Sequence, residues 1–194
     1  IVDGDHIMIL GAVYLKKQNK LANDTLVVTT MSNIGLHVAA KEYGIDLAIT
    51  DVGDRYVIEE MKKSGHNLGG EQSGHMIFLD YNTTGDGTLS SLIVSKIVKE
   101  DGKTLSEQSA LMTTYPQVLI NVDVRNEVKN KFMENDEIRT EIEKLEKLMA
   151  GTGRVLIRPS GTQPLVRVML EGKDEGQIRE LAQELADLIK AKLS

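Results

Sequence analysis

Residues 69–75 read Gly69-Gly70-Glu71-Gln72-Ser73-Gly74-His75, and the apolar run Met76-Ile77-Phe78-Leu79 follows them. Glycines let a backbone turn tightly and approach a ligand closely, and the polar side chains between them offer hydrogen-bond donors and acceptors. A sugar needs this mixture, because each of its hydroxyls requires a partner. The alternative interpretation is a Gly-rich turn that enters a strand, and the loop alone does not decide between the two.

Strands and helices alternate around this loop. The pattern predicts strands at residues 26–28, 45–50 and 76–79, and helices at residues 7–15, 34–44, 56–65 and 87–97. Asp3, Ser32-Asn33 and Asp86 are the expected N-caps. The last of these helices is expected to bury a single stripe of apolar side chains, which consists of Leu89, Leu92, Ile93 and Ile97.

Such alternation is typical of an α/β domain with a mostly parallel, mixed sheet. Ligands of these sheets bind beyond the carboxyl ends of the strands. Ser32-Asn33 and the loop Asp51–Arg55 each follow a strand directly, so we expect them to share one edge of the sheet with the Gly69–His75 loop.

The hydrophobic period changes after a boundary at residues 101–116, which contains the turn Asp101-Gly102 and the break Tyr115-Pro116. Alternating residues 118–124 predict a strand, and they are followed by a helix, two strands and a final helix. We therefore predict two domains: an α/β domain at residues 1–112 and a smaller α+β domain at residues 113–194.

A second polar loop, Pro159–Pro164, lies between the two strands of a predicted hairpin. Strand alternation places Arg158 and Arg167 near the mouth of this loop, away from its core side. Guanidinium groups, the Ser160 and Thr162 hydroxyls and open backbone N–H groups are the parts of a phosphate site. A surface hairpin with solvated arginines is the alternative. Together the two loops indicate one ligand held between two domains.

Composition excludes several classes of function. The 194 residues carry a net charge of -6, which disfavours nucleic acid and acidic membranes as partners. The chain has no cysteine, so disulfides, thiolate metal sites and a cysteine nucleophile are absent. Its longest apolar run is too short for a membrane span and it lacks a secretion signal, so a cytoplasmic location is expected. Because it begins at Ile1 rather than Met, we expect a piece of a longer protein.

The two loops resemble those of a known family. Gly-Glu-Gln-Ser-Gly-His at residues 70–75 and Arg-Pro-Ser-Gly-Thr at residues 158–162 are similar to the sugar-binding and phosphate-binding loops of the α-D-phosphohexomutases. Residues 31–35, 52–56 and 79–87 extend the resemblance over the whole chain, most closely to bacterial members that act on glucosamine phosphates. Members have four domains, and this chain resembles the third and the fourth, the latter with a TATA-box-binding-protein-like fold.

The resemblance implies an isomerase that interconverts glucosamine 6-phosphate and glucosamine 1-phosphate through a phosphoserine enzyme and a 1,6-bisphosphate. This reaction feeds the synthesis of UDP-N-acetylglucosamine and peptidoglycan. The serine and a magnesium-binding loop belong to the first two domains, so this chain is expected to hold no metal and to be inactive alone. The implied partners are the hexosamine phosphate, the missing N-terminal domains and a second copy in a homodimer.

The implied roles fall on named residues. Glu71, Gln72, Ser73 and His75 would contact the sugar, with His75 beside the reacting end, and Asp54 and Arg55 would line the same cleft. The implied phosphate-binding residues are Arg158, Ser160, Gly161, Thr162 and Arg167.

The sequence departs from the family at Gln163, where members usually have Glu. We expect the loss of a negative charge to favour anion binding slightly. Asp3-Gly4-Asp5 does not match the magnesium loop, and capping of a helix is its expected role. Three alternatives stay open: a mutase for glucose or mannose phosphates, a non-catalytic sugar-phosphate-binding module, and a structural or dimerising segment.

Overall fold

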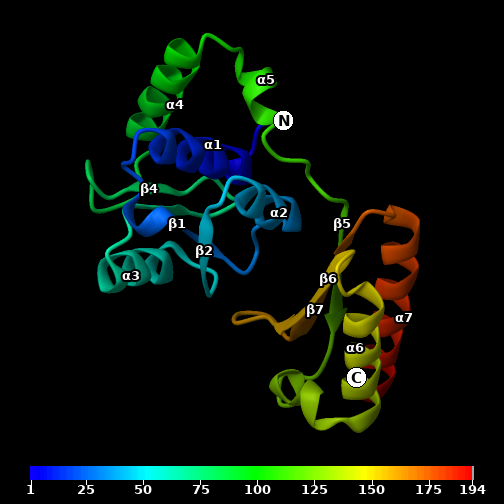
Figure 1. The fold of residues 1–194 in the computed structure, drawn as a ribbon. Helices are drawn as coiled ribbons and strands as arrows, with labels where there is room; N and C mark the ends of the chain where they lie inside the picture. Colours follow the sequence, from blue (N-terminus) through cyan, green and yellow to red (C-terminus); the bar gives the residue numbers. More distant parts are fainter. Residues whose placement is uncertain (194) are drawn as a thin grey trace. The chain divides into compact units, whose positions relative to one another are not determined.

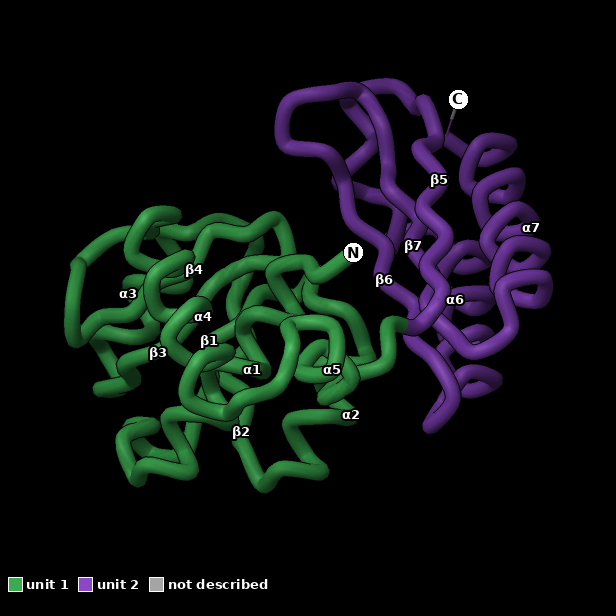
Figure 2. The backbone as a smooth tube through the Cα atoms, turned by 90° about the horizontal axis from the view of Figure 1, so that it is seen from above, with its two compact units in different colours: residues 1–114 green, residues 115–194 purple. Residues whose placement is uncertain are grey.

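The computed structural model describes residues 1–193, and the chain divides into two compact units, Ile1–Thr114 (unit 1) and Tyr115–Ser194 (unit 2) (Figure 2). The sequence placed the division between residues 112 and 113. Each unit has a sheet of its own.

Unit 1 is an α/β domain built on a four-stranded sheet with the order β2-β1-β3-β4. β1 pairs in parallel with β2 and β3, whereas β3 and β4 are antiparallel. The strands are β1 (Thr25–Thr29), β2 (Asp46–Thr50), β3 (Leu68–Gly70) and β4 (Met76–Phe78). The helices are α1 (Gly4–Lys17), η1 (Ala22–Asp24), α2 (Ile34–Glu42), α3 (Asp54–Ser64), α4 (Gly87–Asp101) and α5 (Leu105–Ser109). The mixed, mostly parallel α/β fold is as predicted.

The central strand β1 is buried along its whole length, as expected for a parallel strand covered on both faces. Leu26 and Val28 pack into a core with residues of α1 and α2, whereas Val27 packs with Val57 and Met61 of α3. The sheet therefore has α1 and α2 on one face and α3 on the other (Figure 1). Because β1 runs parallel to β2 and β3, the carboxyl ends of these three strands lie at one edge of the sheet.

Three sequence expectations for unit 1 were wrong. Gly69 and Gly70 are not loop residues but belong to β3. A side chain at Gly69 would lie 2.8 Å from Val57 and 2.9 Å from Met61, so this glycine is needed for close helix–sheet packing. Leu92 is 65% exposed and does not belong to the buried stripe of α4. Asp54 and Arg55 lie in the first turn of α3 rather than in the preceding loop.

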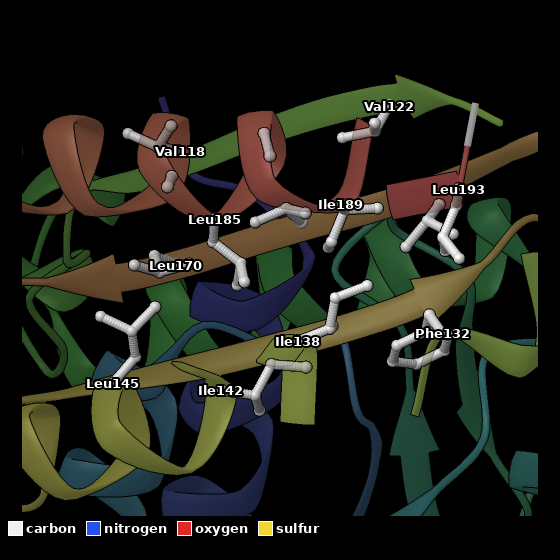
Figure 3. Close-up of a cluster of buried hydrophobic side chains, with 14 of the residues drawn as sticks. Val118, Val122, Phe132, Ile138, Ile142, Leu145, Leu170, Leu185, Ile189 and Leu193 are labelled. Atoms are coloured by element: carbon white, nitrogen blue, oxygen red, sulfur yellow. The ribbon is translucent and has the colours of Figure 1, made fainter. Parts of the chain in front are cut away.

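Unit 2 is an α+β domain with an antiparallel sheet of the order β5-β7-β6. Its strands are β5 (Gln117–Asp123), β6 (Gly153–Pro159) and β7 (Leu165–Gly172). Its helices are α6 (Asp136–Met149), α7 (Glu175–Leu193) and the 3-10 helix η2 (Lys129–Glu134), which the sequence did not predict. Apolar residues of α6 and α7, among them Leu145 and Leu185, cover one face of the sheet (Figure 3).

The other face of this sheet carries side chains in cross-strand rows, because residues of antiparallel strands that pair in register share a face. Asn121, Arg167 and Arg158 form one row, and Gln117, Glu171 and Arg154 form another. The hairpin of β6 and β7 is as predicted.

Every helix within residues 1–193 is too short or too polar to cross a membrane.

Candidate functional site

The loop of residues 71–75 closes the hairpin between β3 and β4. The Glu71 N–H donates to the His75 carbonyl at 2.9 Å, and the Gly74 N–H donates to the Glu71 carbonyl at 2.9 Å. These bonds make a tight turn that presents its side chains outward: Ser73 and His75 are exposed, and Gln72 is half-buried.

Glu71 joins this loop to the loop after β2. Its side chain is only 12% exposed. Its Oε1 atom accepts a hydrogen bond from the Gly53 N–H at 3.0 Å, and its Oε2 atom lies 3.2 Å from Nδ1 of His75. The expected meeting of the two loops at the carboxyl edge of the sheet is thus observed. A carboxylate has about four acceptor sites, so Glu71 keeps capacity to accept from a ligand hydroxyl.

The side chains of Gln72 and Ser73 make no hydrogen bond with any residue in the described range 1–193. Their donors and acceptors are available to a ligand. The backbone beneath them is fixed, because the Gly4 N–H at the start of α1 donates to the Gln72 carbonyl at 3.1 Å. A side chain at Gly4 would lie 2.6 Å from that carbonyl oxygen, so only glycine permits this close approach.

Asp54 and Arg55 occupy the exposed first turn of α3. The Arg55 Nε donates to Glu59 Oε1 at 2.8 Å, and its guanidinium lies 5.9 Å from the ring centroid of Tyr56. The hydrogen bond and charge of Glu59 raise the pKa of Arg55. Arg55 is therefore held along its own helix, so it would have to leave Glu59 in order to contact a ligand.

Asp5 supports the loop after β1, a role that the sequence did not reveal. Its side chain is buried, and its Oδ2 accepts a hydrogen bond from the Asn33 N–H at 2.7 Å. Burial raises the pKa of Asp5 to about 6, and the Asn33 and Ser32 hydrogen bonds oppose the shift. Asn33 in turn caps α2 by accepting from the Gly35 N–H at 2.9 Å. The only sequence signal was a second carboxylate two residues after the cap Asp3.

Asp3-Gly4-Asp5 does not fit a metal ion. Asp3 caps α1 by accepting from the His6 N–H at 3.2 Å, and its carboxylate lies 2.7 Å from Nδ1 of the His6 ring. Asp5 is committed to Asn33. Within residues 1–193 no group of three or more His, Cys, Asp or Glu side chains is arranged to hold a metal ion.

The second polar loop, residues 160–164, is braced internally. The Ser160 N–H donates to the Leu165 carbonyl at 2.9 Å, and the Ser160 Oγ accepts from the Gln163 N–H at 3.2 Å. Ser160 is buried at 5% exposure, whereas Gly161 and Thr162 are exposed. The N–H groups of Gly161 and Thr162 donate to no residue in the described range, so both are open to a ligand.

Arg158 and Arg167 face each other across β6 and β7 at the base of this loop. Both are half-buried, and neither forms an ion pair with a described residue. The Nε of Arg167 is buried without a hydrogen-bond partner. Burial first, and then the charge of Arg167, lowers the pKa of Arg158. Two cations held this way repel each other, and a bound dianion would relieve the repulsion.

Arg154, in contrast to Arg158 and Arg167, forms an ion pair within unit 2. Arg154 lies on the same face, but its Nη2 atom pairs at 2.7 Å with Oε2 of Glu171, which is fully buried. This ion pair was not predicted, although two-residue alternation places both side chains on the face of the sheet that is not covered by helices. Arg154 is thereby committed to the fold, which leaves Arg158 and Arg167 for an anion.

Family models match both units. The model described as phosphoglucomutase/phosphomannomutase, alpha/beta/alpha domain III, matches residues 3–115. The model described as phosphoglucomutase/phosphomannomutase, C-terminal domain, matches residues 119–188.

Curated relatives match the whole chain. It is 70% identical over 194 residues to phosphoglucosamine mutase of Clostridioides difficile (strain 630) and 61% identical to phosphoglucosamine mutase of Thermoanaerobacter sp. (strain X514). The chain spans 43% of the length of each relative.

Solved structures share the fold. An N-acetylphosphoglucosamine mutase of Aspergillus fumigatus matches 98% of this chain with a TM-score of 0.82 and 20% identity, over 43% of its own length. A structure of the same fungal enzyme in complex with GlcNAc-6P and magnesium matches 97% of this chain with a TM-score of 0.80 and 20% identity, over 47% of its length.

Proposed function

This chain belongs to the phosphoglucomutase/phosphomannomutase family, whose domain III and C-terminal domain it contains, and we propose that it supplies the sugar-binding and phosphate-binding half of a phosphoglucosamine mutase. The whole protein then interconverts glucosamine 6-phosphate and glucosamine 1-phosphate. A phosphoserine outside this chain donates its phosphoryl group to the free hydroxyl of the substrate and recovers a phosphoryl group from the 1,6-bisphosphate. Magnesium, where the protein uses it, is held outside these residues, and the protein acts in the cytoplasm.

In unit 1, the proposal assigns sugar hydroxyls to Glu71, Gln72 and Ser73, with His75 beside the reacting end. The unengaged side chains of Gln72 and Ser73 support this role. Asp54 and Arg55 are assigned to the edge of the same surface. Glu71, whose oxygens hold Gly53 and His75, would keep the two loops together while it accepts a hydroxyl.

In unit 2, the proposal assigns the phosphate that is not transferred to Arg158, Ser160, Gly161, Thr162 and Arg167. The observation that carries the proposal is that Arg158 and Arg167 face each other, and that neither forms an ion pair with a carboxylate of the described residues. Charge-assisted hydrogen bonds from guanidinium groups to phosphate are among the strong ones in proteins. The open N–H groups of Gly161 and Thr162 add uncharged donors.

The test is calorimetric titration of the 194-residue chain with glucosamine 6-phosphate, beside glucose 6-phosphate and inorganic phosphate. We expect Arg158→Ala to weaken binding at least tenfold, because a hydrogen bond to a charged group contributes about 1.5–3 kcal/mol. Arg179→Ala, which removes an exposed arginine of α7, is the matched control and should leave affinity unchanged. Equal affinity of both variants would overturn the assignment.

The same titrations address the sugar. Tighter binding of glucosamine 6-phosphate than of glucose 6-phosphate is expected for an amino-sugar enzyme. The reverse order would favour a mutase for plain hexose phosphates.

A further inference from the structure

Lys129 is the first residue of η2, and its side chain contacts the proposed phosphate-binding loop of unit 2. Its side chain is buried, with 9% of the residue exposed. Its Nζ atom donates a hydrogen bond to the backbone carbonyl of Gln163 at 3.2 Å. The sequence gives this lysine no distinction, since it stands among the charged and polar residues of the segment 125–131.

The hydrogen bond from Lys129 is one of several that hold the backbone of residues 163–165, the second half of the loop. The Gln163 carbonyl also accepts from the Leu165 N–H at 2.9 Å, and the Pro164 carbonyl accepts from the Val124 N–H at 3.0 Å. The Gln163 N–H is bonded to Ser160. Every hydrogen-bonding backbone group from Gln163 to Leu165 is therefore engaged, in contrast to the N–H groups at the tip of the loop.

The position of Lys129 is fixed by the core. Val128, which precedes Lys129, packs against the apolar cluster of unit 2, and Phe132, three residues after Lys129, belongs to that cluster. The Lys129 N–H is bonded to the Arg125 carbonyl at 3.2 Å. The backbone of Lys129 is therefore fixed, and its buried ammonium group is held in one position, unlike that of an exposed lysine.

The charge of Lys129 has no counter-ion in the part of the chain that the structure describes. Its one side-chain hydrogen bond goes to a carbonyl, and no carboxylate forms an ion pair with it. A buried charge without an ion partner costs stability. If the side chain at position 129 only filled space, methionine would give a more stable fold, because it has a similar unbranched stem and no charge to bury.

We propose that Lys129 is a positioning residue of the phosphate loop. It holds the Gln163 carbonyl from behind and adds a buried positive charge to the charges of Arg158 and Arg167. The inference rests on the proposed function, because the charge of Lys129 can favour ligand binding only if this loop binds an anion.

The test compares Lys129→Met with Lys131→Met, which removes the same charge from an exposed position two residues further along η2. The probes are inorganic phosphate and glucosamine 6-phosphate, titrated at two ionic strengths. We expect Lys129→Met to weaken phosphate binding about tenfold and to reduce its salt dependence, with the thermal midpoint of unfolding unchanged or raised. Lys131→Met should change affinity less than twofold, and Lys129→Arg should restore most of it.

Amide hydrogen exchange of the ligand-free chain tests the positioning without any phosphate. We expect Lys129→Met to speed exchange at the Gln163 and Leu165 N–H groups several-fold, with the amides of β5 and α7 unchanged. If the wild-type chain binds no phosphate, the proposed function fails in this chain while the exchange result still decides the role of Lys129. Unchanged exchange at both amides, or equal affinity losses in Lys129→Met and Lys131→Met, would overturn the inference.

Discussion

The buried carboxylate of Asp5 lowers the stability of the folded chain at neutral pH, because burial raises its pKa. It is ionised in the unfolded chain above a pKa of 3.8 but holds its proton in the folded chain up to a pKa of about 6. Between these values the folded state binds more protons, so this group makes the free energy of unfolding fall as the pH rises from about 4 to about 6. Above pH 6 the full penalty applies, at about 3 kcal/mol.

Asp5→Asn should therefore be more stable than the wild type at pH 7.5, by about 1–2 kcal/mol, and equal to it near pH 4. The amide oxygen still accepts from the Asn33 N–H, so the loop after β1 keeps its support. Urea denaturation at several pH values measures the difference. Asp46→Asn, at an exposed position of β2, is the control and should show no such trend. A gain that does not depend on pH would contradict the electrostatic explanation.

The exposed side chain of Gln163 allows the charge of the proposed phosphate-binding loop to be changed. Its backbone braces the loop, whereas its side chain is exposed, so a substitution changes charge without changing the brace. Gln163→Glu should weaken phosphate binding about two- to fivefold at low salt, and the difference should shrink at high salt. Calorimetry at two ionic strengths is the measurement. Unchanged or tighter binding by the Glu variant would remove the charge explanation of this departure from the family.

The sequence predicted the placement of some site residues and did not reveal others. Two-residue alternation was enough to place Arg158 and Arg167 together, because an antiparallel hairpin repeats its register from pair to pair. The same register pairs Arg154 with Glu171, so the hairpin that brings Arg158 and Arg167 together also predicts this ion pair. Lys129 and Asp5 could not be found in this way, because their partners depend on packing between segments outside the hairpin.

At the scale of elements, the sequence predicted the helices and strands better than their ends. Caps such as Asp3, Asn33 and Asp86 mark where helices begin, and the structure confirms all three. Gly69 was misassigned because a glycine required by a close helix looks like a glycine required by a turn. Only the contacts of β3 with Val57 and Met61 of α3 distinguish the two cases.

The start of α1 contacts the loop of residues 71–75 through Gly4, whose N–H donates to the Gln72 carbonyl. Gly4→Ala would bring a methyl group against the Glu71 and Gln72 carbonyls, which are backbone atoms that cannot rotate away. We expect a loss of about 1–3 kcal/mol in the stability of unit 1, together with shifted amide NMR signals for residues 71–75.

The control for this element is Gly87→Ala, at the first position of α4, where an added methyl group meets nothing within 4 Å. Its effect should be neutral or stabilising by up to about 1 kcal/mol, since alanine favours a helix over glycine. Equal stability of the two variants would show that the α1 contact does not hold the loop.

At the scale of the whole molecule, each unit has a core of its own. The large cluster of unit 2 contains only residues between Val118 and Leu193, and the clusters of unit 1 contain only residues between Met8 and Met112. Hydrophobic burial is the main stabilising contribution to a fold. The two units should therefore unfold as separate cooperative units.

Leu185→Ala tests this separation, because Leu185 is fully buried between α7 and the sheet of unit 2. The cavity should destabilise unit 2 by about 2–5 kcal/mol. Hydrogen exchange followed by mass spectrometry should show faster exchange in peptides from residues 115–193 and unchanged exchange in peptides from residues 1–114. Leu119→Ala, at a position 46% exposed, is the control and should change little. Faster exchange throughout both units would mean that the chain unfolds as one body, and substitutions in either core would then weaken sugar and phosphate binding alike.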